Sequence, residues 1–129
     1  MRVVEFAARS KFTGAVRTEP RANLRTAGAV VTGAVLTDGT DVNQSEYTMA
    51  EVRAAVDAAA ERGHFVTAHA HGAQGIQYAI QGGVRSIEHA SLIDDAGIAL
   101  AKQNGTWLVM DIYNGDYIDT VGRAQGWSA

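Results

Sequence analysis

The chain of 129 residues is long enough for one domain with its own hydrophobic core. Apolar residues make up 47% of it and charged residues 19%, a composition typical of a globular α/β protein. The net charge of −3 argues against nucleic acid as a partner. No run approaches the ~18 apolar residues that a membrane helix needs. We therefore expect neither a nucleic acid nor a membrane as partner.

The absence of cysteine limits the chemistry that is available to this chain. Disulfides and thiolate metal ligands are excluded. The N-terminus lacks the apolar segment of a secretory signal. Both features are compatible with a reducing compartment, and we expect a cytoplasmic location.

The N-terminal segment differs in charge from the rest of the chain. Of the eleven basic residues six lie within residues 1–25, together with only two of the fourteen acidic residues. A basic arm can contact phosphates, although a solvated, irregular terminus is the simpler interpretation. We divide the chain into a basic irregular arm at 1–26 and a βα domain at 27–129.

From residue 27 onward, short apolar runs alternate with amphipathic helices. Strands are predicted at 27–36, 65–69, 84–88 and 107–111, and helices at 48–62, 73–81 and 94–103. The last three strands begin about twenty residues apart, which is typical of repeated βα units with a parallel sheet. The tail at 113–129 is predicted as loop with one short helix.

Local signals predict where these helices begin and end. Thr48-Met-Ala-Glu51 is a capping box, in which the hydroxyl and the carboxylate each accept a hydrogen bond from the other residue's backbone. Gly63 is placed to end this helix in the left-handed conformation. Either Asp94 or Asp95 caps the last predicted helix.

Two of the predicted strands end in histidine, in Val66-Thr-Ala-His-Ala-His-Gly72 and Val84-Arg-Ser-Ile-Glu-His89. Alternate residues of a strand share a face, so His69 and His71 point the same way if the strand extends that far. Neutral imidazole is the commonest protein metal ligand, and α/β barrels hold their chemistry at the carboxyl ends of strands. We expect His69 and His89 to converge on a metal ion. The alternative is a buried histidine that is hydrogen-bonded to backbone.

Three further positions carry weaker signals. Glu88 precedes His89 and is expected to point the opposite way, toward the helices. Asp111 ends the last predicted strand, where it is a candidate ligand, general base or helix cap. The turn Gly72-Ala-Gln-Gly75 opens a helix after a strand, and a phosphate-binding α/β fold is a third interpretation of the chain.

The residues Thr67–Ile76 and Ala79–Leu92 resemble the metal-dependent amidohydrolase superfamily, in its imidazolonepropionase-like and Xaa-Pro or Xaa-Arg dipeptidase-like branch. Asp95–Ile98 and Trp107–Tyr117 extend the resemblance, which covers roughly residues 27–120. It implies an α/β fold that corresponds to strands four to seven of a (β/α)8 TIM-type barrel, a partial barrel of about four parallel βα units.

The resemblance also implies roles for single residues. His69 and His89 match metal ligands at the ends of barrel strands five and six, whereas His71 and Tyr113 match substrate-binding positions. The metal in this superfamily is usually zinc, as one or two ions, and it polarises the scissile carbonyl and acidifies a water. The implied reaction is hydrolysis of an amide or peptide C–N bond, in dipeptides or N-acyl amino acids.

The sequence departs from this superfamily at several ligand positions. An H-x-H pair on strand one, a lysine on strand four and an aspartate on strand eight have no counterparts, and Gly28 stands at the lysine position. A full barrel needs ~200 residues or more. We therefore expect an incomplete, inactive fragment as one outcome. Open sheet edges predict self-association or a complementary barrel half as partner. The alternative function is a non-enzymatic half-barrel interaction module.

Overall fold

The computed structural model of the protein describes residues 17–18, 26–33 and 39–127, and its centre is a five-stranded sheet. The strands are β1 (Arg17–Thr18), β2 (Thr26–Val30), β3 (Phe65–Ala70), β4 (Ser86–His89) and β5 (Trp107–Val109). From β2 to β5 they run parallel and lie side by side in chain order, whereas β1 pairs antiparallel with β2. The predicted parallel βα architecture is confirmed.

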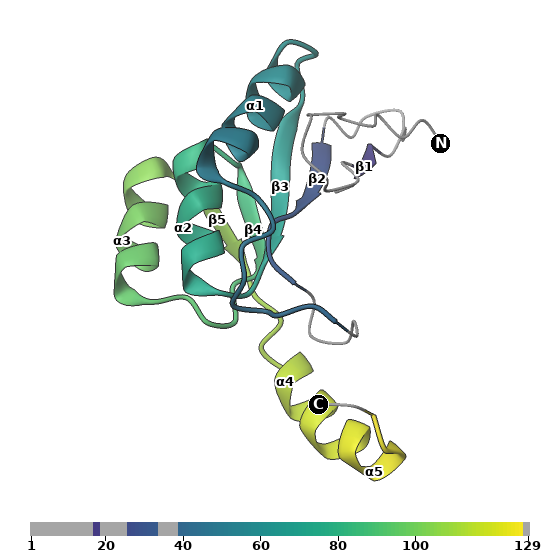
Figure 1. The fold of residues 1–129 in the computed structure, drawn as a ribbon. Coiled ribbons are helices and arrows are strands. Elements are labelled where there is room, and N and C mark those ends of the chain that lie inside the picture. The colour runs from purple at the N-terminus through teal and green to yellow at the C-terminus, as the bar shows by residue number, and fades with distance from the viewer. Residues whose placement is uncertain (1–16, 19–25, 34–38, 128–129) are drawn as a thin grey trace.

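Three helices connect the parallel strands and cover one face of the sheet (Figure 1). They are α1 (Met49–Ala60), α2 (Ala73–Gly82) and α3 (Asp95–Asn104). Consecutive helices pack against each other, and the strand order does not reverse as it does in doubly wound sheets. This arrangement is that of a segment of (β/α)8 barrel wall, as expected from the sequence.

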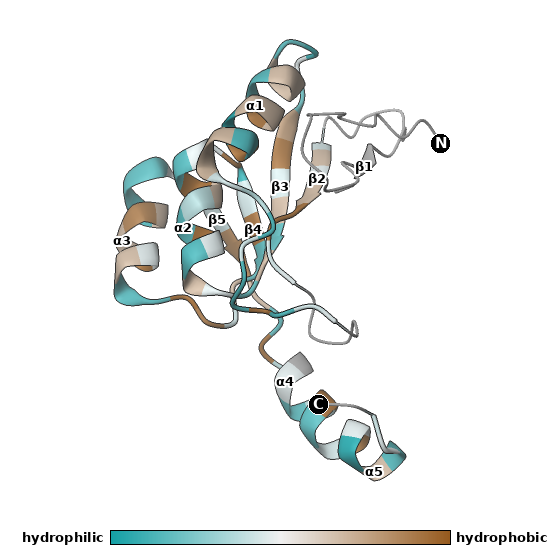
Figure 2. Ribbon diagram, viewed as in Figure 1, coloured by the Kyte–Doolittle hydropathy of each residue, from teal (hydrophilic) through white to brown (hydrophobic). Residues whose placement is uncertain are grey.

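The core lies between the sheet and this helix layer. Along β3, Val66, Ala68 and Ala70 are buried beneath the helices, whereas Phe65 and Thr67 point to the other face. Ile76, Ile80 and Ile87 complete the apolar layer on the helix side. In Figure 2 brown, apolar segments appear on β3 and on all three helices of this layer, mixed with white and teal ones.

The helix ends follow the local sequence signals closely. Both bonds of the capping box are present, with Glu51 Oε2 2.9 Å from the Thr48 amide and Thr48 Oγ1 3.3 Å from the Glu51 amide. The side chain of Asp94 accepts from the Gly97 amide at 2.7 Å, so Asp94 is the cap and α3 begins at Asp95. Gly63 has a φ of 68°, the left-handed conformation expected of it.

The tail contains more helix than its sequence suggested. A short α4 (Asn114–Tyr117), a π-helical turn η1 (Ile118–Gly122) and α5 (Arg123–Gln125) follow one another without interruption. The prediction of a loop with one short helix was therefore wrong. Glycines lower helix propensity and hid this segment. In Figure 1 it extends away from the sheet, from the end where the parallel strands finish.

Several predicted strand boundaries also changed, and β4 begins at Ser86, two residues later than expected. The first parallel strand ends at Val30 rather than at residue 36, and residues 34–38 lie outside the described part. The last strand ends at Val109, two residues earlier than expected. Most of the proposed arm at 1–26 lies outside the described residues, so its boundary stays a prediction.

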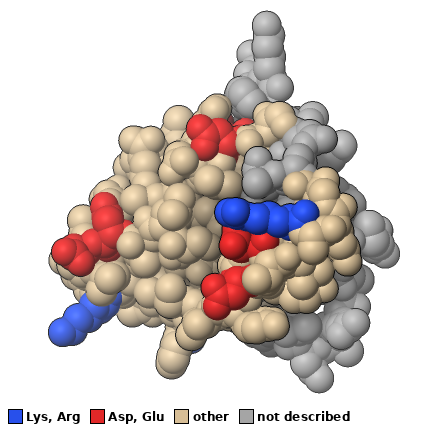
Figure 3. Space-filling view, turned by 90° about the horizontal axis from the view of Figure 1, so that it is seen from below, with Lys and Arg blue, Asp and Glu red and all other residues tan. Residues whose placement is uncertain are grey.

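The second face of the sheet is open among the residues that the structure describes. Four of its apolar side chains are exposed: Val30, Phe65, Trp107 and Val109. Seen from below, the end of the molecule where the strands finish carries scattered charges and no gathering of Lys and Arg among its described residues (Figure 3). Within the described part, no helix is both long and apolar enough to span a membrane.

The packing of α2 against the strand-end loop generates a prediction about Gly75. A Cβ at this position would lie 2.3 Å from Cγ2 of Thr32, a buried side chain. We expect Gly75→Ala to lower the free energy of unfolding by about 1–3 kcal/mol, measured by urea denaturation. Thr32→Ser removes Cγ2 but keeps the hydroxyl, so it should recover much of the loss in the double variant.

The matched control is Gly115→Ala in α4, where an added Cβ meets no atom within 4 Å. It should leave the stability unchanged or raise it slightly. Equal effects of the two glycine substitutions, or no recovery by Thr32→Ser, would contradict this account of the packing.

Candidate metal centre

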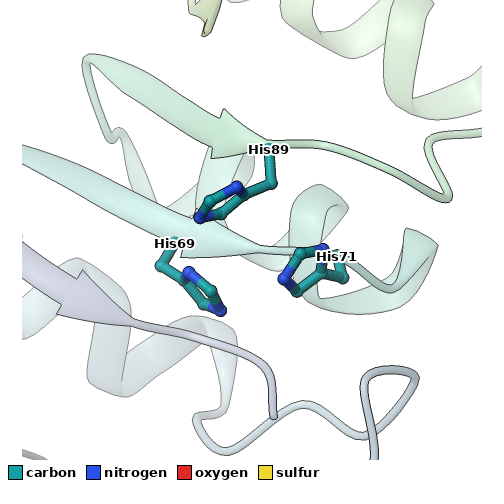
Figure 4. Close-up of side chains that lie close together, drawn as sticks. All are labelled: His69, His71 and His89. Carbon is teal, nitrogen blue, oxygen red and sulfur yellow. The ribbon is translucent and has the colours of Figure 1, made fainter. Parts of the chain in front are cut away.

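Three of the four histidines meet at the carboxyl ends of β3 and β4 (Figure 4). The ring centroids of His69 and His71 are 4.7 Å apart, those of His69 and His89 4.6 Å, and those of His71 and His89 4.8 Å. One nitrogen from each ring can be chosen so that all three lie within 4.8 Å of one another. The structure thus brings together the two predicted ligands and His71.

The end of β3 places His69 and His71. His69 pairs with Glu88 in the parallel register and points to the open face, as strand alternation requires. The strand ends at Ala70, and the amide of His71 donates to Thr32 Oγ1 at 2.9 Å. His71 is only 6% exposed, so packing holds its side chain while this bond holds its backbone.

His89 reaches the same place through an unusual backbone turn. Its register partner is the buried Ala70, so a regular strand would point its side chain toward the helices. Its φ is instead 75°, and the Ala90 amide donates to the Glu88 carbonyl at 3.2 Å. These are the features of a γ-turn with positive φ, a strained conformation for a residue other than glycine. The turn lets the imidazole join the two rings from β3.

This turn also explains why the expectation for Glu88 was wrong. Glu88 lies on the same face as His69 and not toward the helices. Its Oε1 accepts hydrogen bonds from Thr67 Oγ1 at 2.6 Å and from Ser86 Oγ at 3.1 Å. The prediction assumed that His89 continues the strand, whereas His89 is the residue at which the strand conformation breaks.

Two polar side chains contact the outer nitrogens of the cluster. Nδ1 of His89 lies 2.5 Å from Oδ2 of Asp111, and Nδ1 of His71 lies 2.9 Å from Oγ of Ser91. Asp111 was a candidate from its strand-end position. Ser91 was missed, because a serine two residues beyond a strand end has no distinctive sequence signal.

The electrostatics of the cluster favour the neutral imidazole at His69 and His71. Burial, followed by the charge of His89, lowers the pKa of His69 below its usual 6.5. Burial, followed by the charges of His69 and His89, lowers the pKa of His71 to about 4. Neutral imidazole is the form that binds metals, so protons compete little for these two side chains near neutral pH.

One unsatisfied atom of the cluster indicates whether its residues fit a metal ion. Nε2 of His69 is buried and has no hydrogen-bond partner among the described residues. Leaving such an atom unsatisfied costs ~1–3 kcal/mol, and a bound cation would remove this cost. Three imidazole nitrogens match the donor set of zinc. The residues present therefore fit a divalent metal ion.

The side chain of Tyr113 does not converge with the three histidine side chains. Its side chain is 75% exposed, and its ring contact is with Tyr117, at 6.3 Å between centroids. A substrate-binding role for Tyr113 stays a prediction. His71, for which such a role was also predicted, lies in the histidine cluster, where its ring nitrogen is also placed to bind a metal ion.

The turn at Gly72–Gly75 has a packing explanation. A Cβ on Gly72 would lie 2.7 Å from the Val42 carbonyl oxygen, and one on Gly75 would overlap Thr32. Both glycines are thus required by close packing and are not by themselves a sign of a phosphate ligand.

Comparison with known proteins gives consistent results. A sequence model of the amidohydrolase family matches residues 7–125. Ochratoxinase from Aspergillus niger is 32% identical over 91 residues, which are 70% of this chain and 19% of the relative.

Solved structures show the same partial match. An Xaa-Pro dipeptidase with bound methionine in its active site has a TM-score of 0.74 at 35% identity, over 79% of this chain and 25% of that one. A prolidase complexed with N-methylphosphonate-L-proline has a TM-score of 0.74 at 29% identity, over 81% and 26%. The chain therefore spans about a quarter or less of the length of these relatives.

The positive φ of His89 generates a prediction about its replacement. Glycine adopts this conformation without strain, whereas alanine does not. We expect metal-free His89→Gly to be more stable than His89→Ala by roughly 1 kcal/mol, in urea denaturation of both variants.

The opposite order is expected at Ala68, a buried strand residue at which glycine should destabilise the fold. If His89→Ala were as stable as His89→Gly, the positive φ assigned to His89 at this strand end would be contradicted.

Proposed function

The chain belongs to the amidohydrolase family, and we propose that His69, His71 and His89 hold a divalent metal ion in a hydrolase that cleaves amide C–N bonds. The observation that carries the proposal is the buried Nε2 of His69, a member of this cluster, which has no hydrogen-bond partner among the described residues. The Thr67 hydroxyl and the Glu88 carboxylate, on the same face of the sheet, bond each other, and neither is a hydrogen-bond partner of that atom.

In the proposed reaction the metal ion supplies the Lewis acid, and the residues of the chain bind the ion. When bound, a zinc ion supplies a Lewis acid that polarises a carbonyl oxygen and acidifies a water. The neutral imidazoles of His69 and His71 bind the cation without first losing a proton. The bond from the His71 amide to Thr32 fixes the backbone at the end of β3, from which the side chains of His69 and His71 project.

The cluster supports one ion rather than two. Gly28 occupies the open face of β2, in register with Thr67, where the resemblance to the superfamily implies a bridging lysine. Glycine has no side chain to bridge a second ion. Three imidazoles around one cation leave a fourth position for water or substrate, the pattern of catalytic zinc sites.

For the substrate we propose a dipeptide, with an N-acyl amino acid as the alternative. Two similar structures carry the names prolidase and Xaa-Pro dipeptidase, which supports the dipeptide class. Tyr113, just beyond β5, is our proposed substrate contact, and its exposed ring is available for this role. The lack of cysteine supports a reducing, cytoplasmic setting for the enzyme.

A second candidate function rests on the open face of the sheet. Trp107 is 68% exposed on the edge strand β5, and Val109 is 47% exposed on the same face. Exposed apolar groups on an edge strand invite pairing with another chain. A non-enzymatic half-barrel module would use this face to bind a second copy or a complementary barrel half.

The metal proposal is tested by the zinc content of the purified protein. We expect about one zinc per chain, a loss of most of it in His69→Ala, and no loss in His64→Ala. His64 is the matched control because it is the fourth histidine and lies outside the cluster. Equal zinc content in the two variants would remove the metal assignment.

The interaction module is tested by sedimentation velocity. If the open face binds a second copy, the chain sediments as a dimer or larger species, and Val109→Lys shifts it toward monomer. Ile98→Lys is the control, since Ile98 on α3 is 50% exposed, close to the exposure of Val109, but lies on the helix layer. A monomer at all concentrations, or equal effects of both substitutions, would exclude self-association through this face.

A further inference from the structure

We propose that Asp111 is a positioning residue for His89, which it holds in the tautomer and orientation that present Nε2 to the metal ion. The proposal rests on the metal centre proposed above and adds a residue that the comparison with the family does not assign. It begins from the contact between Oδ2 of Asp111 and Nδ1 of His89, at 2.5 Å.

The contact determines where the imidazole proton lies. An ionised carboxylate only accepts hydrogen bonds, so Nδ1 of His89 must carry the proton and donate it. A neutral imidazole has one proton, which leaves Nε2 with a free lone pair. Nε2 is then the nitrogen of His89 that can bind a cation.

The strand order explains why this orientation is the useful one. β4 lies between β3 and β5, so His89 has the two β3 histidines on one side and Asp111 on the other. Glu88 is in register with Val109, so the residues just beyond Val109 lie near His89, and Asp111 is close enough to contact its ring. Asp111 therefore holds the outer nitrogen and leaves the inner one toward the cluster.

The ring of His89 depends on a polar partner for its orientation more than the rings of His69 and His71 do. It sits in a strained turn rather than in a regular strand, and its side chain is 27% exposed. His71, by contrast, is buried and has a hydroxyl partner at its own Nδ1, Ser91. The rings of His71 and His89 lie nearly parallel, 20° apart, each with Nδ1 engaged. A polar side chain thus contacts Nδ1 of both rings, and the carboxylate, which can only accept a hydrogen bond when ionised, contacts the more exposed one.

The test compares zinc affinity, by competition with a chelator, in the wild type and three variants. Asp111→Ala should weaken zinc binding about 10–100-fold, the range typical of losing such a partner. Asp111→Asn should weaken it less, because the amide oxygen still accepts from Nδ1. Asp57→Ala is the control and should bind as the wild type does, since it removes an exposed carboxylate on α1.

A second readout separates positioning from a general structural effect. In metal-free protein, the ¹⁵N shifts of His89 should report a protonated Nδ1 in the wild type and in Asp111→Asn. In Asp111→Ala the proton should move to Nε2, the tautomer that free imidazole side chains favour. If Asp111→Ala does not fold, the tautomer in Asp111→Asn carries the test, and a protonated Nε2 there would overturn the proposal.

The parallel variant His89→Ala distinguishes failure of this proposal from failure of the metal centre. If His89→Ala loses zinc but Asp111→Ala binds it normally with Nδ1 still protonated, the positioning role is wrong and the metal centre stands. If His89→Ala binds zinc as the wild type does, the metal centre itself fails, and the proposal fails with it.

Discussion

The candidate site depends on one backbone constraint, the left-handed turn at His89. Parallel pairing of β3 and β4 brings two strand ends to the same edge, but regular alternation would bury His89 under the helices beside Ala70. A φ of 75° turns the ring back toward His69 and His71. Strain of ~1–3 kcal/mol of this kind persists only where the surrounding structure holds it, and it is concentrated at functional sites. The metal-binding geometry is thus obtained at the expense of local stability.

The surroundings that hold this turn come from both layers of the fold. On the helix side, Ile76, Ile80 and Ile87 form a fully buried apolar layer beneath the strand ends. On the open side, the carboxylate of Glu88 joins β3 to β4 through hydroxyl contacts with Thr67 and Ser86. The Ala90 amide also bonds the Ala70 carbonyl at 3.0 Å, which ties the turn to β3. Packing and hydrogen bonds together compensate for the strain.

Most of the fold could be predicted from sequence because its signals are local. The capping box at Thr48 and the strand-ending histidines act within a few residues, and the structure bears them out. The orientation of Glu88 could not be predicted, because it depends on a tertiary turn at the next residue. The contact of Ser91 with His71 arises from chain reversal after β4. The helical tail was missed because its glycines obscure a helix that Trp127 stabilises, by packing on Gly122.

The central claim is that three imidazoles of this chain share one ion, and X-ray absorption at the zinc edge of the zinc-loaded protein tests it most directly. Our account predicts three imidazole nitrogens at ~2.0–2.1 Å in the wild type and two in His71→Ala. A zinc ion surrounded mainly by water oxygens, or the same number of imidazoles in both proteins, would contradict it.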